Sequence, residues 1–278
     1  MLLAALLAGA ADASGPGVPS PIVFPVVGPY RYTNDFGDPR PQGRHEGNDI
    51  LAPKRATAVA AEDGTIKLWT TSARAGCMLY LYGASGTTYL YIHLNNDLTK
   101  TNDNRGKCVP GVAYWPGLKD GASVVAGQAL AYVGDSGDAD GTPHLHFEVH
   151  PHDGAAVSPY PALNRATRVL FAAPSGSAVT LSLQGRVVSA GADRISVKVQ
   201  TVTVFPLGIK LLGLRRPVTL GLPASALVDG GGEASDRSTI GGLAGKQVIV
   251  LTEPAKTSLD TQSAKDFAFS VARIVLRG

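Results

Sequence analysis

The sequence predicts an all-β fold, and three observations support this prediction. The 278 residues include 33 glycines and 19 prolines, a larger share of turn-forming residues than globular chains usually carry. Hydrophobic residues make up 44% of the chain, which is enough for a packed core and excludes a disordered polymer. Several short segments alternate apolar and polar residues with the two-residue period of a β-strand. The frequent glycines and prolines also exclude helical bundles and coiled coils, and the length fits about two domains.

The N-terminal segment predicts export. Residues 1–11 form the apolar run MLLAALLAGAA, which is shorter than the roughly 20 residues that a membrane-spanning helix needs. Small residues follow it, as at a signal-peptidase site, so residues 1–13 are interpreted as a signal peptide. No lysine or arginine precedes Arg31, which indicates a truncated or misassigned start. No other run reaches transmembrane length, and we expect a protein of the secreted or cell-envelope class with no transmembrane segment.

Two cysteines, Cys77 and Cys108, are compatible with one disulfide in an exported chain. The bond would close a loop of 31 residues, and the alternative is two separate thiols. Neither cysteine has a Cys-x-x-Cys partner, so the sequence does not predict a cysteine zinc site.

The composition divides the chain in two. All six histidines lie between His45 and His152, and a stretch of small residues at 173–178 predicts a linker. The part up to residue 173 has 13 basic and 15 acidic residues, whereas the remainder has 12 basic and 7 acidic residues and a net charge of +5. Residues 179–278 predict a small β-barrel or β-sandwich of unknown role, without histidine or cysteine. Its expected strands cover 179–184, 195–200, 202–204, 247–251 and 267–276.

The segment 141–150, GTPHLHFEVH, carries most of the chemistry. As a strand it places His144, His146, Glu148 and His150 on one face and apolar side chains on the other. Two histidines two residues apart then lie about 7 Å apart, so that one can bind a metal while the other addresses a ligand of that metal. Taken alone, a His-x-His pair is more typical of ordinary exposed or core histidines.

Two upstream segments add further candidates. His45 and Asp49 lie four residues apart in RHEGNDI and share a face in a helix or a strand. Neutral imidazole and carboxylate are suitable zinc ligands. The segment 89–94, YLYIHL, is a predicted strand with His93 near its end.

These segments together resemble the M23 (LytM/lysostaphin-type) zinc peptidases. The resemblance rests on the order RHEGNDI, YIHL and PHLHFE, with GDSG at 134–137 before the last motif and PYP at 159–161 after it. It covers residues 22–164, the expected metallopeptidase domain, and does not extend to the second domain. It implies an antiparallel β-sheet groove, a Zn²⁺ cofactor and a substrate peptide of bacterial peptidoglycan. It implies zinc ligation by His45, Asp49 and His146.

The resemblance also implies that His93 and His144 are active-site residues. We expect His144 to act as the general base toward the water, and His93 to orient the water or stabilise the oxyanion, although these two roles could be exchanged. Glu148 is the competing base, or else a partner that fixes an imidazole tautomer. His150 and His152 are expected to be solvated loop residues.

The sequence therefore predicts a zinc-dependent endopeptidase that hydrolyses peptide bonds of peptidoglycan, in the stem peptide or the cross-bridge. One alternative is a non-catalytic zinc-containing protein that binds the cell wall or activates other hydrolases, and another is a different zinc hydrolase such as an amidase. The polar loop 95–117 is an expected groove wall, with Tyr114 or Trp115 contacting substrate. The basic second domain either binds anionic wall polymers or is an ordinary accessory domain. It lacks the aromatic platforms of nucleic-acid-binding domains.

Overall fold

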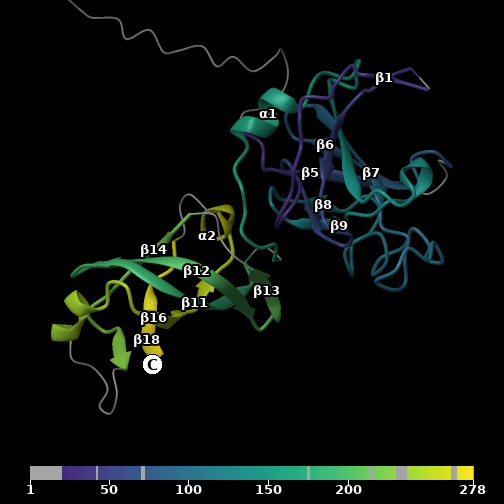
Figure 1. Cartoon of the computed structure of the whole chain (residues 1–278). Helices are drawn as coiled ribbons and strands as arrows, with labels where there is room; N and C mark the ends of the chain where they lie inside the picture. The colour runs from purple at the N-terminus through teal and green to yellow at the C-terminus, as the bar shows by residue number, and fades with distance from the viewer. Residues whose placement is uncertain are drawn as a thin grey trace, which may run out of the picture.

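The computed structural model describes residues 21–41, 43–69, 73–173, 176–212, 216–229, 237–263 and 268–277. The predicted signal peptide at 1–13 lies outside the described residues, as do two residues of the predicted linker at 173–178. The described chain is almost entirely β, as predicted, and its strands gather in two regions of space (Figure 1). One hydrophobic core draws its residues from 22–163 and a second from 171–274.

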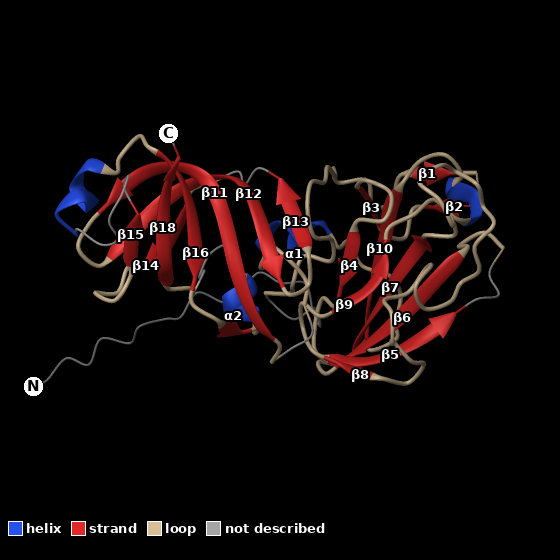
Figure 2. Ribbon diagram, turned by 90° about the horizontal axis from the view of Figure 1, so that it is seen from below, coloured by secondary structure: helices blue, strands red, loops and turns tan. Residues whose placement is uncertain are grey.

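The N-terminal region is built on one antiparallel six-stranded sheet with the order β3-β10-β7-β6-β5-β8 (Figure 2). Its strands are β3 (Asn48–Leu51), β5 (Gly64–Trp69), β6 (Cys77–Gly83), β7 (Thr87–Leu94), β8 (Ser123–Val124) and β10 (His144–Pro151). Two small ladders accompany the sheet, namely β1 (Pro39–Arg40) with β2 (Gly43–Arg44), and β4 (Thr57–Val59) with β9 (Ala129–Tyr132). The short helices are η1 (Gly137–Ala139) and α1 (Tyr160–Arg165).

Strand β10 shows the alternation that its sequence predicts. Leu145, Phe147 and Val149 are fully buried in the first core. The ring of Phe147 packs on those of Tyr89 and Tyr91 of β7, with centroids 5.7 and 5.3 Å apart. Because successive side chains of a strand point to opposite faces, this packing directs the histidines of β10 to the other face of the sheet.

The C-terminal region contains an eight-stranded sheet, mostly antiparallel, with the main order β13-β12-β11-β16-β18-β15. Its elements are β11 (Ala178–Ala190), β12 (Arg194–Phe205), β13 (Ile209–Leu212), β14 (Val218–Gly221), β15 (Leu227–Asp229), η2 (Arg237–Gly242), β16 (Gln247–Thr252), β17 (Ala255–Lys256), α2 (Leu259–Gln262) and β18 (Val271–Arg277). The strands predicted at 179–184, 195–204 and 247–251 are therefore confirmed, and the last predicted strand begins at Val271. No ladder between the described strands closes this sheet into a barrel.

The two regions touch through a small apolar cluster. Val169 and Ala172 pack with Val23, Val59 and Ala129, and the side chain of Leu259 in α2 packs against them. A backbone hydrogen bond from Leu170 to Gln262 adds to the contact. The contact surface lies at β4 and β9. Trp115, a predicted substrate contact, packs against this cluster, whereas none of the three predicted zinc ligands belongs to it.

The disulfide between Cys77 and Cys108 is present, with Cα atoms 5.2 Å apart. It ties the loop between β7 and β8 to β6. Within the described residues, no helix is long and apolar enough to cross a membrane. In the second region, Arg194 and Arg273 pair with Asp193 and Asp229, which neutralises part of the basic charge locally. Binding of wall polymers by this region stays a prediction.

Candidate active site

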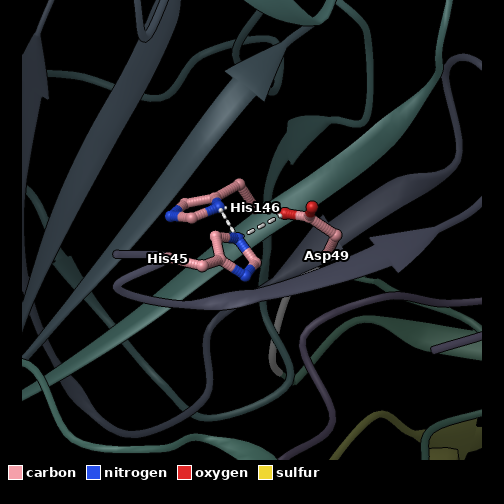
Figure 3. A group of neighbouring side chains, drawn as sticks. All are labelled: His45, Asp49 and His146. Carbon is pink, nitrogen blue, oxygen red and sulfur yellow. Dashed lines mark hydrogen bonds and ion pairs between the residues drawn. The ribbon is translucent and has the colours of Figure 1, made fainter. Parts of the chain in front are cut away.

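The three predicted ligands, His45, Asp49 and His146, converge on one point (Figure 3). Nε2 of His45 lies 3.0 Å from Oδ1 of Asp49 and 2.9 Å from Nδ1 of His146. The third side of the triangle, from His146 Nδ1 to Asp49 Oδ1, is 2.9 Å. Residues separated by about a hundred positions in the sequence thus present three ligand-type atoms to one another.

Strand pairing explains this convergence. His146 of β10 is the direct cross-strand partner of Asp49 of β3, so their side chains leave the sheet side by side. His45 lies just before β3, and the chain passes close to β10 at Gly47. A Cβ on Gly47 would lie 2.6 Å from the carbonyl oxygen of Phe147 and 2.8 Å from Nε2 of His146. Glycine is therefore required at position 47, between His45 and Asp49, because the backbone approaches the imidazole of His146 closely there.

The hydrogen bonds of each imidazole determine which nitrogen faces the cluster. Nδ1 of His45 lies 2.8 Å from the carbonyl oxygen of Asp35, an acceptor, so this nitrogen carries the proton and Nε2 keeps its lone pair. Nε2 of His146 lies 2.9 Å from Oε1 of Glu148 and donates to it, which leaves the lone pair on Nδ1. Both histidines thus direct their unprotonated nitrogen at the carboxylate oxygen of Asp49.

This donor set fits a zinc ion. Two imidazole lone pairs and a carboxylate oxygen at mutual distances of 2.9–3.0 Å repel one another unless a positive charge lies between them. The surroundings of His146 make the same demand for positive charge, which a proton on Nδ1 meets when no cation lies between the ligands. Although burial opposes protonation, the hydrogen bonds with Asp49 and Glu148 raise the pKa of His146 to about 9. Two nitrogens and one oxygen make up a three-residue ligand set of the kind that leaves a fourth zinc position open.

Glu148 holds the outer side of the cluster. Its Oε1 accepts from His146, and its Oε2 lies 2.7 Å from Nε2 of His150. Although burial opposes ionisation, these hydrogen bonds lower the pKa of Glu148 to about 2. A carboxylate with both oxygens engaged by imidazoles fits the predicted tautomer-fixing role better than that of a base. The expectation that His150 is a solvated loop residue is wrong, because this side chain is part of β10 and bonds to Glu148 and to the carbonyl oxygen of Gly154.

His93 and His144 lie beside the three ligands. The ring centroids of His93 and His144 are 4.9 Å apart, and that of His93 is 6.0 Å from the ring of His146. Nε2 of His144 lies 3.5 Å from Oδ1 of Asp49, while its Nδ1 donates to the carbonyl oxygen of Thr142. The lone pair of His144 therefore points to the cluster, and no protein group outside the cluster engages it among the described residues.

His93 is held in a special backbone conformation. It has φ of +60°, a left-handed conformation that is uncommon for residues other than glycine, at an irregularity in the pairing of β6 and β7. Its Nδ1 donates to the carbonyl oxygen of Ser136, and the hydroxyl of Ser136 in turn bonds to the backbone of Leu94 and Cys77. Burial, together with the nearby His144, lowers the pKa of His93 to about 4, so this side chain is neutral at pH 7.

Several supporting residues were missed from sequence alone. Asp35 accepts from His45 through its carbonyl group, and its carboxylate lies 2.5 Å from Nδ2 of the buried Asn48. Arg40 donates to Oδ2 of Asp49, the carboxylate oxygen that faces away from the cluster. Asn48 lies within the motif RHEGNDI, but its partner Asp35 lies 13 positions away, so the sequence gave no signal for this contact.

A hollow of about 680 Å³ opens next to the cluster. Its lining includes Asp49, His144 and residues of the segments 31–35 and 138–142. The expected contact of Tyr114 with substrate is wrong, because this side chain is fully buried and its hydroxyl donates to the backbone of β5 and β6. Trp115 is partly buried against the first core.

Comparisons with solved structures give matches over about half of the chain. A candidate glycyl-glycine endopeptidase LytM from Ruminococcus gnavus is 22% identical at a TM-score of 0.40, with coverage of 54% of this chain and 63% of that one. The catalytic domain of lysostaphin from Staphylococcus simulans is 24% identical at a TM-score of 0.39, covering 49% of this chain and 92% of that domain. A mutant of the catalytic domain of the prophage-encoded M23 protein EnpA from Enterococcus faecalis is 25% identical at a TM-score of 0.35, covering 48% and 90%.

The chain thus spans less than two thirds of the length of the Ruminococcus gnavus protein. No sequence-family model matches the chain. One of these matches, EnpA, is an M23 protein, and M23 is the family that the sequence motifs resemble.

Proposed function

We propose that this protein is a zinc-dependent endopeptidase that hydrolyses peptide bonds of bacterial peptidoglycan and acts in the cell envelope after export. The observation that carries the proposal is the convergence of His45, Asp49 and His146 next to two further imidazoles, beside an open hollow. The peptidoglycan substrate and the site of action rest on the motif resemblance.

The three ligands would hold the zinc ion, with His45 through Nε2, His146 through Nδ1 and Asp49 through Oδ1. When bound, zinc lowers the pKa of a coordinated water to about 7 and polarises the scissile carbonyl group. Glu148 and the carbonyl group of Asp35 keep the two imidazoles in the ligating tautomer.

His144 is the proposed general base. Its Nδ1 donates to Thr142, which leaves Nε2 as a proton acceptor directed at the cluster. Because Nε2 is 3.5 Å from the ligand oxygen of Asp49, it would accept a proton from a water held beside the cluster.

His93 is the proposed water-orienting residue. Because its Nδ1–H is donated to Ser136 and its pKa is lowered to about 4, neutral His93 offers only an acceptor at Nε2. An acceptor can orient the attacking water, whereas stabilising an oxyanion requires a donor. Of the two roles predicted for His93, the geometry favours the first.

The alternative of a non-catalytic wall-binding protein requires the ligand cluster but not the two additional imidazoles. His93 and His144 therefore favour the hydrolase. The discriminating experiment is mass spectrometry of the products released from defined peptidoglycan fragments, with and without a chelator. We expect chelator-sensitive fragments with amino acids on both sides of the cut.

Three variants test the assigned roles. His146→Ala and Asp49→Ala are expected to lose both bound zinc and hydrolysis, whereas His144→Ala should keep zinc and lose turnover. A His146→Ala protein that retains zinc and activity contradicts the ligand assignment. Release of whole stem peptides from the glycan would instead identify an amidase.

A further inference from the structure

The sheet face that carries the cluster continues past it onto β6 and β5. Register places Glu148 of β10 opposite Leu90 of β7, Leu90 opposite Tyr80 of β6, and Tyr80 opposite Lys67 of β5. Directly paired residues share a face, so all four side chains lie on the face of the metal-type ligands. Tyr82 lies on the same face, one pair further along the strands. It is paired with Thr88 of β7, and Thr88 is paired with His150 of β10.

Three aromatic side chains form a row on this face. Tyr80 lies between the other two, with its ring parallel to that of Tyr82 at a centroid distance of 6.1 Å and an interplanar angle of 4°. The ring of Trp69 meets that of Tyr80 edge-on at 5.9 Å. Trp69 and Tyr82 are 40% and 45% exposed, although large aromatic side chains are usually buried. We call Trp69, Tyr80 and Tyr82 the aromatic row.

The position of the aromatic row relates it to the active site. Two to three strand spacings of about 4.8 Å separate β10 from β6 and β5, and Tyr80 and Tyr82 are offset from His146 by two and four residues along the strands, which places the row roughly 12–16 Å from the cluster. An extended peptide covers that distance with about four or five residues. A substrate whose scissile bond lies at the cluster would therefore bring a group four or five residues away onto the aromatic row.

The chemistry of the row favours an uncharged ligand with a flat apolar face. Exposed tyrosine and tryptophan rings offer rigid contact surface with polar groups at their edges. The charged neighbours compensate each other, because Nζ of Lys67 lies 2.8 Å from Oδ2 of Asp120. A pyranose ring fits such a surface, since its axial C–H bonds pack on an aromatic ring while its hydroxyl and acetamido groups form hydrogen bonds at the edges.

We propose that the aromatic row is a saccharide-binding subsite for the N-acetylated glycan strand that carries the peptide substrate. The inference deepens the proposed function and rests on it for the identity of the glycan. In this arrangement neighbouring sugars of the glycan stack on Tyr82 and on Trp69, on either side of Tyr80, and the peptide extends across β7 toward the cluster. The enzyme then selects peptides that are still attached to glycan.

Direct binding of tetra-N-acetylchitotetraose, measured by NMR titration and calorimetry, tests the subsite independently of hydrolysis. We expect the wild type to bind and the Tyr82→Ala and Trp69→Ala variants to bind about tenfold more weakly, the loss typical of one stacked ring. Tyr82→Phe keeps the ring and should bind within a factor of about two. Leu227→Ala removes an apolar side chain that is 40% exposed on the second region and should leave binding unchanged.

A second test compares the kinetics of two substrates that differ only in the attached sugar. For a peptide attached to a disaccharide, Tyr82→Ala should raise KM about tenfold, whereas KM for the same peptide without sugar should not change. The proposal is overturned if the wild type does not bind the tetrasaccharide, or if both alanine variants bind it as the wild type does. Saccharide binding without any hydrolysis would retain the subsite and contradict the proposed enzymatic function instead.

Discussion

Gly47 lies directly against the imidazole ring of His146. A Cβ at this position would be 2.8 Å from Nε2 of His146, the nitrogen that donates to Glu148. The same Cβ would lie 2.6 Å from the carbonyl oxygen of Phe147. The imidazole of His146 or the backbone must therefore shift to accommodate any side chain at position 47. The glycine at position 47 thus keeps Asp49 of β3 aligned with His146 of β10.

Gly47→Ala is therefore expected to reduce zinc affinity at least tenfold, because ligands displaced from their supporting contacts bind metal more weakly. Calorimetric titration of zinc into the chelator-treated protein measures the effect. Gly242→Ala is the matched control, since no atom lies within 4 Å of its added Cβ. Equal zinc affinity of Gly47→Ala and the wild type would contradict the close-approach argument.

Glu148→Gln tests the support of the cluster from outside. The amide keeps the shape of the side chain but lacks the charge that fixes the tautomer of His146 and bonds to His150. We expect zinc affinity to fall roughly 10–100-fold while the fold is retained. His150→Gln removes only the outer partner and should have a smaller effect. If Glu148 were instead the general base, Glu148→Gln would abolish turnover with zinc affinity unchanged.

The lowered pKa of His93 predicts an acid-side loss of stability. The folded-state value of about 4 lies below the unfolded value of about 6.5, so the unfolded chain takes up the proton first as the pH falls. Stability is therefore lost between about pH 6.5 and pH 4, and His93→Gln removes this contribution. Between pH 7 and pH 5 the wild type should lose about 2 kcal/mol more than the variant.

Urea unfolding followed by tryptophan fluorescence measures this difference, because both tryptophans lie in the N-terminal region. A chelator in all samples removes any contribution from metal release. If the free energies of unfolding of the wild type and His93→Gln change with pH in the same way, the prediction of a lowered His93 pKa is contradicted.

Lys54 holds together two loops near the active site. Its Nζ lies 2.6 Å from Oδ2 of Asp97 and 2.9 Å from Oδ1 of Asp135, and both aspartates are fully buried. Lys54→Met leaves these carboxylates without their cation and should destabilise the N-terminal region by about 3 kcal/mol. Lys67→Met breaks the half-exposed pair with Asp120 and should change stability little, because solvent screens exposed ion pairs. Thermal unfolding of the two variants measures the contrast.

The sequence was most informative where one strand carries both core and site. Alternation along 144–150 predicts the buried Leu145 and Phe147 and the polar face opposite them, since a strand places neighbours on opposite faces. The three ligands were predicted from motif order. Their convergence follows from the pairing of β3 with β10, which local patterns do not determine.

Contacts between loops were not predictable in the same way. The bond of His45 to the carbonyl group of Asp35 and that of Arg40 to Asp49 depend on how the segment 31–44 folds back on β3. The left-handed conformation of His93 depends on an irregular pairing between β6 and β7. The short strands β13, β14 and β15 were also missed, because three or four residues give too little alternation to identify a strand.

The most direct test of the metal centre is anomalous diffraction at the zinc edge from crystals of the protein with one equivalent of zinc. The account predicts one strong peak bonded to Nε2 of His45, Oδ1 of Asp49 and Nδ1 of His146, with His93 and His144 nearby but not coordinated. A peak on a different set of residues, or no peak in zinc-supplemented crystals, would contradict it.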